Sequence, residues 1–123
     1  MTKDLQEIEA FIRQLLLAQS PTLRMRKNES DVLEACGTKE AMQGKQKVDG
    51  FYFASVMPKP KDIRFYFFPL YTHSNEFSLS SELQKMLKGK TCFHLKMLNE
   101  ALQTELSLLV SQAIKIYQED DLI

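Results

Sequence analysis

The sequence has little of what disordered, nucleic-acid-binding or membrane-spanning proteins require. Four glycines and four prolines occur among 123 residues, 44% of which are hydrophobic, and this composition excludes extensive disorder. Sixteen basic residues balance sixteen acidic ones. Because nucleic-acid binders need a basic excess, no nucleic-acid partner is expected. No apolar run approaches the roughly 20 residues that span a bilayer, so no membrane partner is expected either.

The sequence also lacks the cysteine patterns of disulfide-rich and zinc-binding proteins. Its two cysteines, Cys36 and Cys92, form no CxxC pair and have no metal-ligand spacing. The first residues are polar and lack the apolar core of a signal peptide, so a cytoplasmic location is expected. A chain of this length is the size of one domain with its own core, and we expect residues 1–123 to form a single domain.

Apolar residues at helical spacing predict a helix at each end of the chain. The first pattern of helical spacing covers residues 3–18. Asn99 is expected to cap a long C-terminal helix. Ser80 or Ser81 is expected to cap a short helix, with Gly89 as its left-handed terminator. The apolar positions are Leu5, Ile8, Ile12, Leu15 and Leu16 in the first helix and Leu102, Leu106, Leu109, Val110, Ala113 and Tyr117 in the last.

Alternating apolar residues between turn residues predict an antiparallel meander between these helices. The expected strands are residues 22–26, 50–57, 63–68 and 91–95. Residues 38–46 fit either a short strand or a helical turn. The predicted fold class is therefore α+β: an N-terminal helix, a four- to five-stranded antiparallel sheet, and two C-terminal helices with a short strand between them.

Both faces of the central strands carry apolar residues, which is unusual for a sheet covered by helices on one side. In residues 63–68, one face carries Ile63, Phe65 and Phe67 and the other face carries Arg64, Tyr66 and Phe68. In residues 50–57, one face carries Phe51, Phe53 and Met57 and the other face carries Tyr52, Ala54 and Val56. An apolar second face needs a partner, a ligand or cover by the loop at 72–79. We expect a homodimer, since two-fold pairs are the commonest soluble oligomers.

The candidate ligand or partner surface combines aromatic side chains with a cation. Its expected residues are Tyr52, Arg64, Tyr66, Phe68, Tyr71 and His73. Such a set forms the centre of a protein interface or lines a pocket for a planar small molecule. The identity of the small molecule or protein is not encoded in these residues.

A phosphate-loop fragment occurs at Gly89, Lys90 and Thr91. The full pattern needs a glycine five residues before Gly89, where Gln84 stands. A phosphate loop also leads from a strand into a helix, whereas here a helix precedes a strand. Lysines near a helix C-terminus explain this segment better, because they complement the helix dipole.

A cysteine and a histidine lie two residues apart in the last predicted strand, so Cys92 and His94 share one face. A thiolate nucleophile needs a base within hydrogen-bond reach and a third group that orients this base, and the sequence places none. We expect a structural cysteine, no catalytic residue, no cofactor and no metal site. A thiol-dependent enzyme that uses Cys92 and His94 is an alternative.

Two segments together resemble the YdhG-like family of small bacterial domains. They are the aromatic-Pro-aromatic turn at residues 65–71 and the strand of Gly89, Lys90, Thr91, Cys92, Phe93 and His94. The resemblance covers most of the chain, best at residues 50–117, whereas residues 22–48 lack the Met-Pro-containing strand turn of many members. It implies a single helix–sheet–helix domain, and the family has no settled activity.

YdhG-like domains are similar in layout to frataxin, which implies an iron-binding chaperone as a second alternative. Frataxins bind iron through an acidic ridge that includes the first helix. Here that helix offers Asp4, Glu7 and Glu9, but Glu7 and Glu9 project about 160° apart. The function favoured by the sequence is therefore a small, non-catalytic binding or interaction domain.

Overall fold

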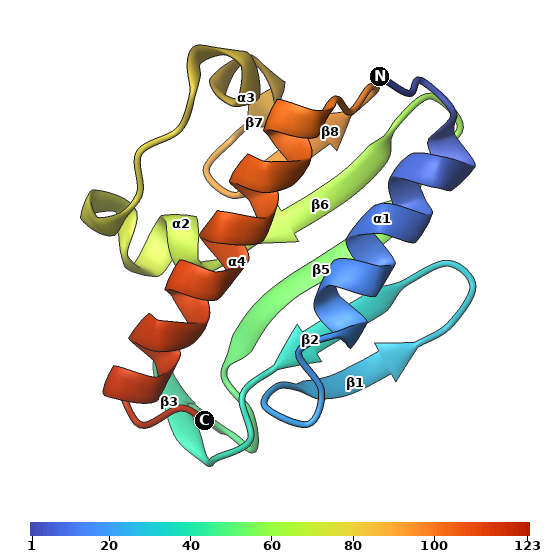
Figure 1. The fold of residues 1–123 in the computed structure, drawn as a ribbon. Coiled ribbons are helices and arrows are strands. Elements are labelled where there is room, and N and C mark those ends of the chain that lie inside the picture. Colours follow the sequence, from blue (N-terminus) through green and yellow to red (C-terminus); the bar gives the residue numbers. More distant parts are fainter.

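Helices α1 (Leu5–Leu17) and α4 (Glu100–Glu119) cover one face of a six-stranded antiparallel sheet (Figure 1). The computed structural model describes residues 1–123. In spatial order, the sheet consists of β1 (Arg24–Asn28), β2 (Leu33–Cys36), β5 (Tyr52–Pro58), β6 (Ile63–Phe67), β8 (Cys92–Leu95) and β7 (Leu87–Lys88). This α+β architecture confirms the predicted class, with more strands than expected. None of the helices is both long and apolar enough to cross a bilayer.

Polar side chains begin the helices where the sequence predicts caps. The carboxylate of Asp4 accepts from the backbone N–H groups of the first turn of α1. The Ser80 hydroxyl accepts from Leu83 N at 3.1 Å and begins α3 (Ser81–Met86). The Asn99 side chain accepts from Leu102 N at 2.8 Å and begins α4. Each cap satisfies a backbone donor that has no partner within its own helix.

The predicted role of Gly89 as a helix terminator is wrong. Helix α3 ends at Met86, and Leu87 already has extended backbone angles because it pairs with Phe93 across β7 and β8. Gly89, with a φ of 70°, lies in the turn that joins these two strands. Cross-strand pairing therefore ends α3 before a left-handed cap can form.

A β-bulge in β5 changes the predicted division of its faces. Ala35 and Cys36 are opposite Ala54 and Tyr52, so Phe53 is the extra residue of β5. The prediction that Ala54 and Val56 share a face with Tyr66 is wrong: Ala54 lies opposite Phe67 and Val56 opposite Phe65. The opposite face of β5 instead carries Ser55 and Met57, directly opposite Tyr66 and Arg64. The predicted division of β6 stands, and this second face is more polar than expected.

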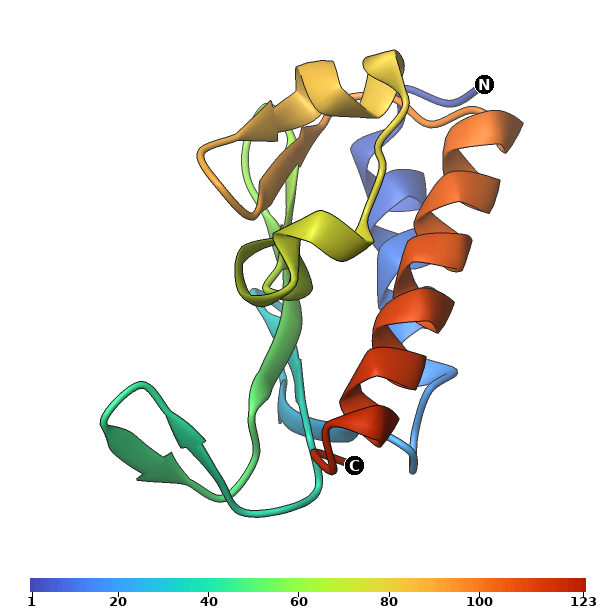
Figure 2. The ribbon, with the colours of Figure 1, turned by 90° about the vertical axis from the view of Figure 1, so that its left-hand side faces the viewer.

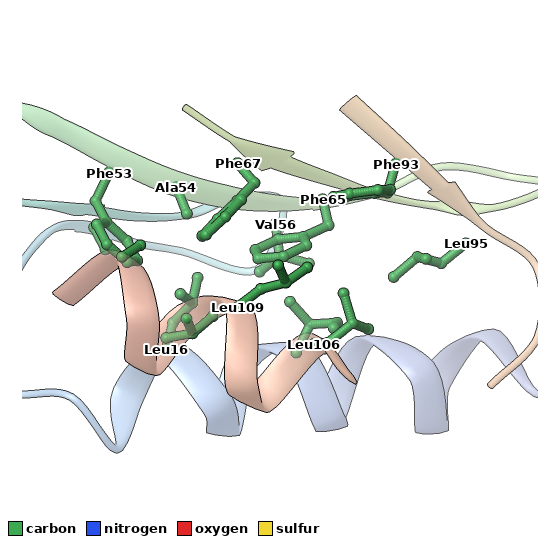
Figure 3. Close-up of a cluster of buried hydrophobic side chains, with 14 of the residues drawn as sticks. Leu16, Phe53, Ala54, Val56, Phe65, Phe67, Phe93, Leu95, Leu106 and Leu109 are labelled. Atoms are coloured by element: carbon green, nitrogen blue, oxygen red, sulfur yellow. The ribbon is translucent and has the colours of Figure 1, made fainter. Parts of the chain in front are cut away.

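The core lies between the helices and the sheet, and it contains 24 buried residues. Figure 3 shows Phe65 and Phe67 pointing from β6 toward Leu106 and Leu109 of α4. Both phenyl rings are fully buried. Phe53 packs edge-on against Phe67, with 5.8 Å between the ring centroids. The bulge thus adds an aromatic ring to the helix-facing core.

Residues 38–46, for which the sequence left two possibilities, contribute to a hairpin. Strands β3 (Ala41–Gln43) and β4 (Gln46–Val48) pair with each other and form a separate two-stranded sheet. Gly44, with a φ of 65°, provides the left-handed residue of the tight turn. The hairpin projects from the sheet on the side away from the helices (Figure 2). A short helix, α2 (Pro69–Thr72), and a 3-10 turn, η1 (Ser74–Glu76), follow β6.

Candidate functional site

The sheet face opposite α1 and α4 is the candidate site, and we call it the open face. One row of directly opposite residues crosses it from β2 to β7, namely Glu34, Ser55, Tyr66, Cys92 and Lys88. A second row contains Met57, Arg64 and His94. Because paired residues share a face, the register brings together Arg64, Tyr66, Cys92 and His94 from the predicted set.

The loop at 72–79 does not cover the open face. Phe77 packs edge-on against Phe67 in the helix-facing core, with 5.6 Å between the ring centroids. The backbone oxygen of Glu76 accepts a hydrogen bond from the Gln112 side chain of α4. The loop therefore follows the helix layer, which contradicts the alternative in which it covers the second sheet face.

Aromatic rings form a continuous group at one end of the open face. Phe68 lies 5.4 Å from Tyr52 and 5.8 Å from Tyr71, measured between ring centroids. The Tyr52 hydroxyl hydrogen-bonds Ser55 Oγ at 2.6 Å, and burial raises the pKa of Tyr52 to about 12. Tyr71 is exposed, with Lys90 Nζ 5.2 Å above its ring. This group presents half-buried apolar surface with a cation at its edge.

A buried carboxylate connects the charged groups at the other end. Asp62, only 5% exposed, accepts a hydrogen bond from Arg64 Nε at 2.8 Å. Its second oxygen lies 3.5 Å from Nδ1 of His94. Burial, and then the positive charge of Arg64, lower the pKa of His94. The imidazole is therefore mainly neutral at neutral pH, and its contact with Asp62 is one between a neutral ring and a carboxylate.

The Cys92 thiol is not activated for nucleophilic attack. The residue is buried, and burial raises the pKa of its thiol. Its Sγ hydrogen-bonds the backbone oxygen of Phe93 at 3.9 Å, and the His94 ring lies against Asp62 rather than the sulfur. A nucleophilic cysteine needs the opposite environment, in which a base or a cation stabilises the thiolate.

We expect Cys92 to react slowly with iodoacetamide at neutral pH. Its raised pKa reduces the thiolate fraction, and its burial restricts access, so alkylation should be at least roughly tenfold slower than in the urea-unfolded chain. Peptide mass spectrometry separates Cys92 from Cys36, which is also buried and serves as an internal reference. Alkylation of native Cys92 faster than of the unfolded chain would contradict this assignment and favour a thiol enzyme.

The structure separates His73 from the other predicted surface residues. Its Nε2 lies 2.8 Å from a carboxylate oxygen of Asp120, which is the C-cap of α4. Its Nδ1 lies 2.8 Å from the Thr72 hydroxyl. His73 thus links the segment after α2 to the end of α4. The position of His73 two residues after Tyr71 in the sequence does not predict that its side chain faces α4.

The predicted acidic residues of the first helix are engaged in local contacts. Asp4 caps α1, and Glu7 accepts a hydrogen bond from the Thr2 hydroxyl at 3.0 Å. Glu9 lies 3.7 Å from Arg13, one turn further along the helix. No group of three or more His, Cys, Asp or Glu side chains lies close enough to hold a metal ion. This geometry offers no support for a frataxin-type iron site.

Sequence reasoning missed Asp62, the buried carboxylate of the open face. A signal was present, because Asp62 and Arg64 stand two residues apart at the start of a strand and so share a side. The length of the preceding turn obscured where this strand begins. Comparisons of the chain with protein-family models, with curated proteins and with solved structures found no significant match.

Proposed function

We propose that this chain is a non-catalytic binding domain and that the open face is its binding surface. The observation that supports this proposal is an uncovered face with half-buried aromatic side chains next to Arg64. Tyr52, Tyr66 and Phe68 are each partly exposed, and the helices α1 and α4 lie on the other face of the sheet. The β3–β4 hairpin reaches this face beside Tyr52, whose backbone N–H donates to Gln43 Oε1 at 3.3 Å. Exposed aromatic and arginine side chains are enriched at the centres of protein interfaces.

The proposed partner is a second copy of the same chain. Tyr66 occupies the middle of the row from Glu34 to Lys88, with the row's residues on β2 and β5 on one side and those on β8 and β7 on the other. A two-fold axis near Tyr66 would bring the same surface of both copies together, as isologous interfaces require. The polar residues Ser55 and Asp62 already have partners within the chain, so pairing would not leave them unsatisfied.

Membership of the YdhG-like family is part of this proposal. The two segments that carry the resemblance are adjacent in space, since Tyr66 of the aromatic strand lies directly opposite Cys92 of the second motif. The arrangement of two long helices on one face of an antiparallel sheet is also compatible with a frataxin-like layout. An iron chaperone and a thiol enzyme have no comparable supporting geometry.

We expect wild-type protein to scatter light as a dimer, with twice the 14.3 kDa mass of one chain. Tyr66→Asp should be monomeric, because it places a charge at the centre of the interface, where desolvation is costly. The matched control is Leu108→Asp on the outer surface of α4, where the side chain is 64% exposed. This control should remain dimeric.

A monomeric wild type at tens of micromolar would overturn the second copy as the partner. Dissociation of Leu108→Asp but not of Tyr66→Asp would place the interface on the helix layer instead. Thermal unfolding of each variant establishes that a change of mass is not a consequence of misfolding.

A further inference from the structure

Charge is segregated in this molecule although its total is balanced. The two long helices, together with their caps Asp4 and Asp120, carry seven carboxylates and two basic residues. Residues 85–96 carry four lysines and no carboxylate. This segment includes β7 and β8, at the edge of the sheet (Figure 1). The opposite edge, β1, is also basic, but Arg24 and Arg26 there are paired with the carboxylates of Asp49 and Glu34.

Three of these lysines surround a hollow of about 230 Å³. Its lining consists of Lys85, Met86, Lys88, His94 and Lys96. These residues come from α3, β7, β8 and the residue that follows β8. Pairing of β7 with β8 fixes the relative positions of their backbones. The hollow therefore has cationic groups on separate elements that the fold holds together.

The lysines of the hollow have no counter-charge within the protein. Lys85, Lys88 and Lys96 form no ion pair, as is true of all the lysines except Lys39 and Lys47, whereas all four arginines are paired. The nearby carboxylate of Asp62 is already bound by Arg64. Arg64 is the cross-strand partner of His94 and lines an adjoining hollow of about 240 Å³ with Lys59 and Lys61. The whole edge is thus short of negative charge.

We propose that the hollow lined by Lys85, Lys88, His94 and Lys96 binds the phosphate group of a small phosphorylated ligand. Lysine ammonium groups bind phosphate as point charges, and His94, once protonated beside the anion, donates a hydrogen bond from the ring nitrogen that does not face Asp62. The volume is below the roughly 300–1,000 Å³ typical of pockets for larger ligands, which favours one phosphate group over a nucleotide. The site lies where the rows of the open face reach the sheet edge, and all of its lining residues come from one chain.

The neighbours of His94 are consistent with a positive site. Its pKa is lowered by burial and by Arg64, Lys88 and Lys96, against the opposing effect of Asp62. The other titratable groups nearby are Lys85 in the same hollow, Cys92 on the same strand and Tyr66 opposite Cys92. A phosphate anion in the hollow adds negative charge beside the imidazole. It should therefore raise the pKa of His94.

Proton NMR of the two histidines tests the site directly. We expect inorganic phosphate, compared with chloride at matched ionic strength, to shift the His94 ring signals saturably and to raise the pKa of His94. His73 is held by Asp120 at the end of α4 and serves as an internal reference that should not respond. Equal responses of both histidines, or no response of His94, would overturn the proposal.

Variants on the same fold identify the groups responsible. Lys88→Glu should weaken phosphate binding roughly tenfold or more, since it reverses a charge beside the anion. Lys115→Glu makes the same charge change on the exposed surface of α4 and should leave binding unchanged. Equal weakening by the two substitutions would show a general charge effect and overturn the site.

A short single-stranded oligonucleotide is the remaining probe. Weak binding of the oligonucleotide, no tighter than inorganic phosphate, supports a small ligand. Much tighter binding of the oligonucleotide, with a steep dependence on salt, would replace the small ligand by a nucleic-acid backbone. This result would leave the dimer proposal intact, because that proposal is tested by mass rather than by the histidine signals.

Discussion

Replacement of Phe65 by alanine should destabilise the fold by roughly 3–5 kcal/mol. The Phe65 ring is fully buried and lies 5.7 Å from Phe67 and 6.2 Å from Phe93, measured between centroids. Truncation removes apolar contacts and leaves a cavity beneath α4, near Leu106 and Leu109 (Figure 3). Rigid strands and helices on both sides prevent the cavity from closing, so most of the cost should persist.

Urea unfolding measures this cost. The midpoint of Phe65→Ala should fall by roughly 2 M for a protein of this size, and Phe67→Ala should behave similarly. Tyr71→Ala is the matched control, because Tyr71 is an aromatic residue that is 56% exposed. Its midpoint should change little. If neither phenylalanine variant lost stability, the helix-facing side of the sheet would be wrongly assigned.

Tyr117→Ala should cause a loss of similar size, roughly 3–5 kcal/mol. Tyr117 is fully buried in α4, and its ring packs edge-on against Phe53 with 5.1 Å between centroids. Its hydroxyl donates a hydrogen bond to the backbone oxygen of Tyr52. The side chain therefore joins the last helix to the strand at its bulge, through both a ring contact and a hydrogen bond.

Tyr117→Phe separates the two contributions. It keeps the ring contact with Phe53 but removes the donor to the Tyr52 carbonyl, so we expect a smaller loss of about 1–3 kcal/mol. Urea midpoints of the two variants give the comparison. Equal losses in Tyr117→Phe and Tyr117→Ala would contradict a packing role for the ring.

The helices and the strands of the core were accessible from sequence. Periodic apolar residues located α1 and α4, and the caps Ser80 and Asn99 were identified because a serine or asparagine side chain accepts from the first helical turn. The alternation in residues 63–68 correctly placed Phe65 and Phe67 toward the helices. These features depend on neighbours within a few residues, which a local pattern records.

The features that sequence missed depend on pairing between distant segments. The bulge at Phe53 arises where β2 and β5 pair, and it moves Val56 to the core face. The contact between His73 and Asp120 joins residues 47 positions apart. The basic hollow likewise requires α3 to approach β8, and the overall charge balance conceals it. One sequence contains no local signal for such contacts.

A dilution series of amide NMR spectra of the isotope-labelled wild type distinguishes pairing through the open face from pairing through the helices. Pairing through the open face should give concentration-dependent shifts at residues such as Tyr52, Ser55 and Tyr66, while Leu108 on the outer surface of α4 does not respond. Shifts confined to α1 and α4, or unchanged spectra of a protein that light scattering shows to be a monomer, would contradict pairing through the open face.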